Sequence, residues 1–211
     1  MKKINVFLAS LTLLFFTNLN AEMKYGFSLI GGITDISGTE TEGTAADTSA
    51  RSKSITEQFI GGDLFIEMAD DSGVAYGISW VPLDVELGNG SRTDSDGDDA
   101  AENDDGTRTA KAELTNLLTA YANVPMGTGG WYYLLGVHYT EVKTTETLNE
   151  SSYGDEKIFG GQIGVGLKSN NLKYELAYSD FEDIDLTATG GGTNSVSADA
   201  DALTFKISYG F

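Results

Sequence analysis

His138 is the only histidine in this 211-residue sequence, so it is the first residue to consider for catalysis. A catalytic histidine needs a nucleophile beside it or an acid that orients it. The sequence contains no Gly-x-Ser-x-Gly elbow and no second histidine for a metal pair. We therefore interpret His138 as an interior side chain with satisfied hydrogen bonds, and we expect the protein not to be an enzyme.

The second candidate for chemistry is an acid-dense segment, residues 93–106. Asp94, Asp96 and Asp98 have the alternate spacing with which flexible loops offer oxygen ligands to Ca²⁺. The next residue is Asp99 rather than the glycine of an EF-hand loop, so the segment is not an EF-hand. We interpret it as a solvated acidic loop, with a weak calcium site as the alternative, and we expect no cofactor.

Composition excludes several other classes of function. The chain has 13 Lys and Arg against 32 Asp and Glu, a net charge of −19, so it lacks the basic surface that nucleic-acid binding requires. It has no cysteine, which rules out disulfides, iron–sulfur clusters and thiolate zinc sites. The 26 glycines with ten Tyr and ten Phe are typical of a sheet-rich protein.

The N-terminus has the order of a secretory signal peptide. Lys2 and Lys3 precede the apolar run 6–16, and a polar stretch then leads to Ala21. The run is too short for a membrane anchor. We predict a signal peptide over residues 1–21 and one mature domain over residues 22–211.

Beyond Tyr25, apolar residues recur at every second position, which predicts strands with two different faces. The last segment is the clearest, with the apolar face Leu203, Phe205, Ile207, Tyr209 and Phe211. The segment that starts at Trp131 repeats the pattern. The fourth segment stays ambiguous, because two sets of residues compete for its apolar face: Leu114, Leu118, Ala120, Ala122 and Val124 against Leu117 and Tyr121.

The connections between these segments alternate in length. Short turns are expected at 69–73, 125–130 and 169–171, and long polar loops at 37–54, 88–109, 141–156 and 187–198. Eight strands with short turns at one end and long loops at the other are typical of a bacterial outer-membrane barrel. We predict an all-β fold, an eight-stranded antiparallel up-and-down transmembrane β-barrel. Pro82 predicts a bulge or a strand end.

The second face of the strands carries polar and charged side chains. A lysine facing lipid at mid-bilayer costs roughly 2–4 kcal/mol, so we place this face inside the barrel. The interior of an eight-stranded barrel is just wide enough for side chains, so we expect a network that plugs the lumen, with a narrow channel as the alternative. The predicted network is Asp63, Glu67, Glu113, His138, Gln162, Lys168, Lys173, Glu175 and Lys206.

Aromatic residues lie near both ends of the apolar faces. Trp131 and Tyr139 are eight steps apart, about 26 Å along a strand at roughly 3.3 Å per residue. This separation favours two belts at the membrane interfaces. The predicted interface residues are Tyr76, Trp80, Trp131, Tyr133 and Tyr139.

These features resemble the small outer-membrane β-barrel proteins of Gram-negative bacteria, namely OmpA transmembrane domains, OmpX and the opacity-type porin-like proteins. The ending Phe205-x-Ile207-x-Tyr209-x-Phe211 is similar to the C-terminal signal that the family's insertion machinery reads, and the strand from Trp131 is similar to the family's aromatic–Leu–Gly strand. The resemblance implies a cell-envelope protein of the outer membrane, integral and monomeric, with long loops outside and both termini periplasmic.

Family members include adhesins, narrow channels, stabilising barrels and a few lipid-modifying enzymes, so the resemblance implies location more firmly than role. The expected role is structural or adhesin-like. The alternatives are a porin-like channel for small solutes and, less favoured, a lipid-modifying enzyme. Expected partners are outer-membrane lipid and lipopolysaccharide, with divalent cations bridging the acidic loops to its phosphates.

Overall fold

The computed structural model describes residues 23–44, 47–94, 106–147, 151–190 and 194–211. These residues form strands and short connections, and no helix among them is long and apolar enough to cross a bilayer. The predicted signal peptide, residues 1–21, lies outside the described residues. The strands are β1 (Met23–Thr44), β2 (Asp47–Ala69), β3 (Ala75–Trp80), β4 (Val85–Asp94), β5 (Gly106–Pro125), β6 (Trp131–Glu146), β7 (Ser151–Ser152), β8 (Asp155–Ser169), β9 (Leu172–Phe181), β10 (Ile184–Thr187), β11 (Thr189–Gly190) and β12 (Ser195–Gly210).

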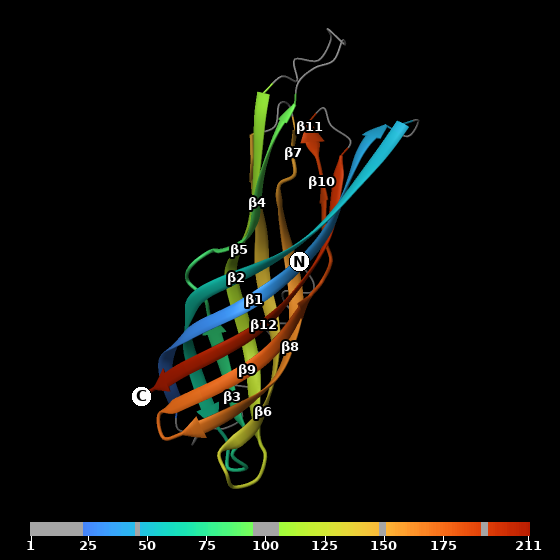
Figure 1. Ribbon diagram of the computed structural model, residues 1–211. Helices are drawn as coiled ribbons and strands as arrows, with labels where there is room; N and C mark the ends of the chain where they lie inside the picture. Colours follow the sequence, from blue (N-terminus) through green and yellow to red (C-terminus); the bar gives the residue numbers. More distant parts are fainter. Residues whose placement is uncertain (1–22, 45–46, 95–105, 148–150, 191–193) are drawn as a thin grey trace.

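The strands close into one antiparallel barrel (Figure 1). The ring runs β1, β2, β3, β5, β6, β8, β9 and β12, and β12 pairs back with β1. β4 pairs with β5 beyond the end of β3, and β10 pairs with β12 beyond the end of β9. β7 and β11 form a small separate two-stranded sheet. The predicted eight-stranded antiparallel barrel is therefore confirmed.

The predicted assignment of faces is confirmed in the short-turn half of the barrel. On β12, Leu203 and Phe205 are each 49% exposed, whereas Ser208, which lies on the opposite face of the strand, is 1% exposed. Trp131, Tyr133 and Leu135 on β6 point outward in the same way. Alternation of this kind leaves an apolar belt around the outside, which requires an apolar surrounding such as lipid.

The polarity of both faces inverts farther along the same strands. On β1 the outward side chains change from Ile33 to Asp35, while the inward ones change from Thr34 to Ile36. Pairing in register places the corresponding outward charges on the neighbouring strands at this level: Asp35 beside Asp201, and Glu141 beside Lys157. The barrel thus has an apolar exterior in the half with short turns and an apolar interior in the half with long hairpins, which we call the hairpin half.

A bulge in β5 explains the ambiguous fourth segment. The register with β6 shifts between Thr115 and Leu118, so β5 has one extra residue there, and Asn116 has a φ of 55°. One extra residue exchanges the two faces of a strand. Both competing sets of residues therefore point inward in part: Leu114 before the bulge, and Tyr121 after it.

The short turns occur where the sequence predicts them, but the long segments differ from the prediction. Strands β1, β2, β4, β5, β6, β8 and β12 continue through most of the stretches expected to be loops (Figure 1). Their hydroxyl side chains pair across strands, as Ser37 does with Ser54 and Thr39 with Ser52. The outward residues of these stretches are polar, which favours a loop prediction, although they alternate with inward apolar residues. Pro82 lies between β3 and β4, and so marks a strand end.

Within the described residues, the strand pairing of the wall is interrupted between β2 and β4, and also between β8 and β10. β3 pairs with β2 only from Leu64 to Ala69, and β4 pairs with β5 rather than with β2. Residues 47–63 of β2 therefore have a strand partner on the β1 side only, within the described part of the chain. In Figure 1 the β1–β2 hairpin leans away from the β4–β5 hairpin.

Candidate functional site: a plugged lumen

An ion pair between β2 and β9 crosses the lumen near the short-turn end. Lys173 Nζ lies 2.6 Å from Glu67 Oε2, and both side chains are buried. The same carboxylate oxygen accepts hydrogen bonds from Tyr121 Oη at 3.3 Å and Asn123 Nδ2 at 3.2 Å, both on β5. A buried charge pair is tolerated when further hydrogen bonds satisfy its atoms, and these three donors do so for Glu67.

A second charged group lies next to the first. Lys206 on β12 places its Nζ 2.9 Å from Glu175 Oε2 and 3.6 Å from Asp63 Oδ2. Tyr132 donates a hydrogen bond of 2.7 Å to the other oxygen of Glu175. Three carboxylates and two ammonium groups therefore meet in the lumen, and the carboxylates outnumber the lysines by one.

Aromatic rings fill the space between these charges. Lys173 Nζ lies 4.5 Å from the centre of the Phe65 ring, and Lys206 Nζ lies 5.6 Å from that of Tyr121. The ring of Tyr121 lies against Gly77, and that of Tyr132 against Gly166, where any Cβ would overlap the ring. Glycine at these two positions lets each ring lie flat across the lumen.

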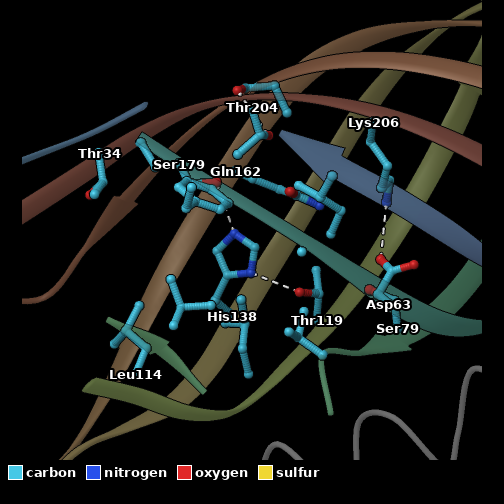
Figure 2. Close-up of a pocket in the computed structure, with 18 of the residues that line it drawn as sticks. Thr34, Asp63, Ser79, Leu114, Thr119, His138, Gln162, Ser179, Thr204 and Lys206 are labelled. Atoms are coloured by element: carbon cyan, nitrogen blue, oxygen red, sulfur yellow. Dashed lines mark hydrogen bonds and ion pairs between the residues drawn. The ribbon is translucent and has the colours of Figure 1, made fainter. Parts of the chain in front are cut away.

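His138 forms the next layer toward the hairpin half (Figure 2). Thr119 Oγ1 lies 2.8 Å from its Nδ1, Ser179 Oγ lies 3.0 Å from its Nε2, and Phe181 stacks on the ring at 5.3 Å. Both ring nitrogens thus have hydroxyl partners, and neither hydrogen bonds to a carboxylate within the described residues. Ser179 and His138 have the elements of a nucleophile and base, but the orienting group is a hydroxyl instead of an acid.

An apolar cluster closes the lumen above His138. Its buried members come from β4, β5, β6, β8, β10 and β12, and they pack together inside the barrel. Val142 and Ile158 are each 1% exposed. The buried members are Leu87, Leu114, Val142, Ile158, Ile184, Leu186 and Ala200.

The remaining residues of the predicted network lie outside these groups. Glu113 precedes the bulge, so it lies on the outer face, where it pairs with Lys111 at 2.6 Å. Lys168 lines the opening at the short-turn end beside Lys173. Gln162 points into the lumen against Gly136.

The predicted calcium residues fall largely outside the described part of the chain. Asp94 is the last residue of β4, and Asp96 and Asp98 belong to the gap that follows it. Among the described residues, no group of three potential metal ligands lies together.

The predicted interface aromatics lie on the outer face at two levels. Tyr76, Trp131 and Tyr133 are on the short-turn side of the belt, whereas Trp80 and Tyr139 both flank Leu118 at the other side. The residues of the C-terminal signal, Phe205, Ile207, Tyr209 and Phe211, also face outward. Tyr209 and Phe211 pack edge to face at 5.2 Å, and Tyr25 lies 5.6 Å from Phe211.

Five residues that hydrogen bond to the lumen carboxylates or to His138 are absent from the predicted network. They are neutral polar or aromatic residues: Thr119, Tyr121, Asn123, Tyr132 and Ser179. Each of them lies on the inward face of its strand, an even number of positions from another inward residue. The period of two in the sequence could therefore have placed them in the lumen.

Solved structures with this fold are outer-membrane β-barrel proteins. The outer-membrane protease OmpT of Escherichia coli matches over 92% of this chain and 99% of its own, with a TM-score of 0.51 and 10% identity. The outer-membrane protein AlkL, solved in lipid bilayers, matches over 88% and 90%, with a TM-score of 0.47 and 12% identity. The attachment invasion locus protein Ail of Yersinia pestis, in complex with sucrose octasulfate, matches over 86% and 98%, with a TM-score of 0.33 and 13% identity.

No protein-family model and no curated protein sequence matches the chain. The similarity to OmpT is one of fold, because 10% identity does not extend to the chemistry of a site. The chain is therefore a small barrel with the fold of the outer-membrane β-barrel proteins.

Proposed function

We propose that this protein is a non-enzymatic, integral barrel of the bacterial outer membrane that stabilises the envelope or presents a surface for contact. The apolar belt spans the membrane, the long hairpins lie outside the cell, and the short turns with both chain ends lie in the periplasm. The acidic change between Ile33 and Asp35 on β1 marks the outer boundary of the membrane. The protein is a monomer, and its C-terminal residues Phe205–Phe211 are read by the barrel insertion machinery.

The observation that carries this proposal is the double closure of the lumen. The charged groups around Glu67 and Lys206 lie across the short-turn half, and the apolar cluster around Val142 lies across the start of the hairpin half. Ions would have to cross both layers, and the second offers them no polar partners. A barrel closed along its axis presents its outer surfaces, rather than an open channel, to its surroundings.

Planar-bilayer recording of the purified full chain tests the closure. We expect no steady openings of the wild type at any holding potential at which the bilayer itself is stable. A variant that removes the apolar layer's large side chains, Leu114→Ala with Ile158→Ala, serves as the comparison for a loosened lumen. Steady wild-type openings would replace this proposal with the narrow-channel function.

The partner on the outer surface is lipopolysaccharide, bridged by divalent cations. The net charge of −19 makes direct binding to phosphate unfavourable, whereas a divalent cation can join two anionic groups. We expect lipopolysaccharide to co-purify with the native protein and to be lost on washing with a chelator. Retention of the same amount after chelation would contradict cation bridging, with a magnesium-containing wash as the control.

A further inference from the structure

We propose that the lumen between the two plugs is a binding pocket for a single neutral alkyl chain, which reaches it sideways through the interrupted wall between β2 and β4. The inference goes beyond the proposed function, because it concerns a ligand site inside the barrel. It stands on the shape of the cavity, on the gap in the wall and on the residues that surround the gap.

The cavity lies between the charged groups and the apolar cluster (Figure 2), and its volume is about 100 Å³. Asp63, Glu175 and Lys206 line its floor, and Leu87 and Leu114 its opposite end. An engineered apolar cavity of about 150 Å³ in another protein binds benzene, so this smaller cavity suits only the end segment of one narrow alkyl chain. The other lining side chains are ten apolar ones, Ile30, Phe59, Val81, Val85, Leu117, Leu134, Ala177, Phe181, Ala200 and Ala202, and seven neutral polar ones, Thr34, Ser79, Thr119, His138, Gln162, Ser179 and Thr204.

The cavity lies next to the gap in strand pairing between β2 and β4. On the short-turn side the gap in the wall begins after the last β2–β3 pair, Leu64 with Trp80. On the hairpin side it ends where the side chain of Ile55 reaches β4, since a Cβ on Gly88 would lie 2.7 Å from Ile55 Cδ1. Between these limits the cavity is lined by residues from both edges of the gap, among them Gly61 and Val85.

The outside of this gap belongs to the apolar belt. Ile60 is 85% exposed, Leu83 66% and Trp80 43%, and these three residues surround the gap. A route that opens among exposed apolar side chains meets lipid rather than water. The molecules that can use it are therefore those that dissolve in the membrane.

The charges at the floor of the cavity favour an occupant without a negative charge. Its three carboxylates outnumber its two lysines, and Lys206 is already shared between Glu175 and Asp63. A carboxylate or phosphate head group would add a further negative charge where no ammonium is left for it. A neutral chain avoids this cost, whether it is the tail of a membrane lipid or a free apolar solute.

Two glycines offer a matched pair of variants. A Cβ on Gly61 would have no atom within 4 Å, and this residue shares the inward alternation of Phe59 and Asp63, so a side chain there enters the cavity. A Cβ on Gly31 also has no atom within 4 Å, but Gly31 shares the outward alternation of Leu29 and Ile33. Gly61→Phe should fill the cavity, and Gly31→Phe should add a ring to the outer surface.

The test is bromine quenching of tryptophan fluorescence in the folded full chain, reconstituted in phosphatidylcholine vesicles. The chain has two tryptophans, so Trp80→Phe with Trp131→Phe leaves a background into which Phe59→Trp introduces one cavity reporter. A chain that keeps Trp131 alone is the lipid-facing control. Heat-modifiable electrophoretic mobility verifies folding of each variant, and Gly61→Leu replaces Gly61→Phe if the larger residue prevents it.

We expect 1-bromodecane to quench the Phe59→Trp reporter with a saturable dependence that Trp131 lacks. Gly61→Phe should weaken this component about tenfold or more, and Gly31→Phe should leave it unchanged. A second measurement uses vesicles of dibromostearoyl phosphatidylcholine without 1-bromodecane. If the reporter is quenched there and Gly61→Phe relieves the quenching, the occupant is a lipid tail. If the reporter is quenched by 1-bromodecane but not by the brominated lipid, the occupant is a free solute. Quenching by neither probe, or quenching insensitive to Gly61→Phe, would overturn the proposal.

Discussion

The two halves of the lumen are filled by opposite chemistry within the same strands. The short-turn half holds ion pairs and phenol rings, whereas the hairpin half holds aliphatic side chains. The exterior changes in the reverse sense, from an apolar belt to a polar surface. The comparison shows that the inside of each half is set by what surrounds it: where lipid receives the apolar side chains, the polar ones must find partners within.

Breaking one buried ion pair should have the largest effect. Glu67→Ala leaves the Lys173 ammonium buried without its carboxylate, and we expect the free energy of unfolding to fall by about 3–5 kcal/mol. Urea unfolding in lipid vesicles, followed by tryptophan fluorescence, measures it. The double variant Glu67→Gln with Lys173→Met should recover most of the loss. A loss that the double variant does not reduce would mean that Glu67 acts through packing alone.

An aliphatic truncation in the hairpin half should have a somewhat smaller effect of a different kind. Ile158→Ala creates a cavity in the apolar cluster, with an expected cost of about 2–5 kcal/mol that does not depend on salt. The adjacent outward residue provides the control, since Lys157→Ala should change stability by less than about 0.5 kcal/mol. Equal costs for the two variants in the same unfolding assay would contradict an apolar interior at this level.

The smallest effect should come from a turn outside the membrane. The pKa of Asp70 is lowered from its usual value by a hydrogen bond from the Ser72 hydroxyl, together with those from the backbone amides of residues 72–74. A lowered pKa in the folded state stabilises the turn above the ordinary carboxyl pKa, and this contribution is lost as pH falls through the lowered value. Asp70→Ala should therefore differ from wild type at neutral pH and converge with it in acid, as measured by urea midpoints across pH. If the difference in urea midpoint between Asp70→Ala and wild type persists unchanged below the lowered pKa, the effect comes from the conformation of the turn and not from the charge of Asp70.

The sequence was sufficient to predict the barrel because each strand obeys a period of two over its lipid-facing part. It was insufficient at Asn116, where one extra residue exchanges the faces of β5, although asparagine at a positive φ is the residue type such a bulge favours. It also failed in the hairpins, since Ile36 alternates with Asp35 and Ser37 in a strand whose polarity is reversed. A search that accepts either face as the apolar one would have predicted the longer strands.

The candidate site was predictable in kind but not in its pairs. Inward alternation places Glu67, Lys173, Glu175 and Lys206 in the lumen, but which carboxylate meets which lysine depends on the stagger between strands. Lys206 and Glu175 are neighbours in register on β12 and β9, so their pairing follows from adjacency. Glu67 and Lys173 lie on strands that are not adjacent in the ring, and only the closed geometry brings them together.

The pairing of β1 with β12 has a consequence for how the chain must mature. Ser28 and Ser208 hydrogen bond across this seam although they are 180 residues apart in sequence. Closure therefore depends on contacts of very high sequence separation, which form slowly and leave strand edges exposed to aggregation until they do. The first strand therefore stays unpaired on one side until the last strand is available, and its backbone edge is exposed during that time.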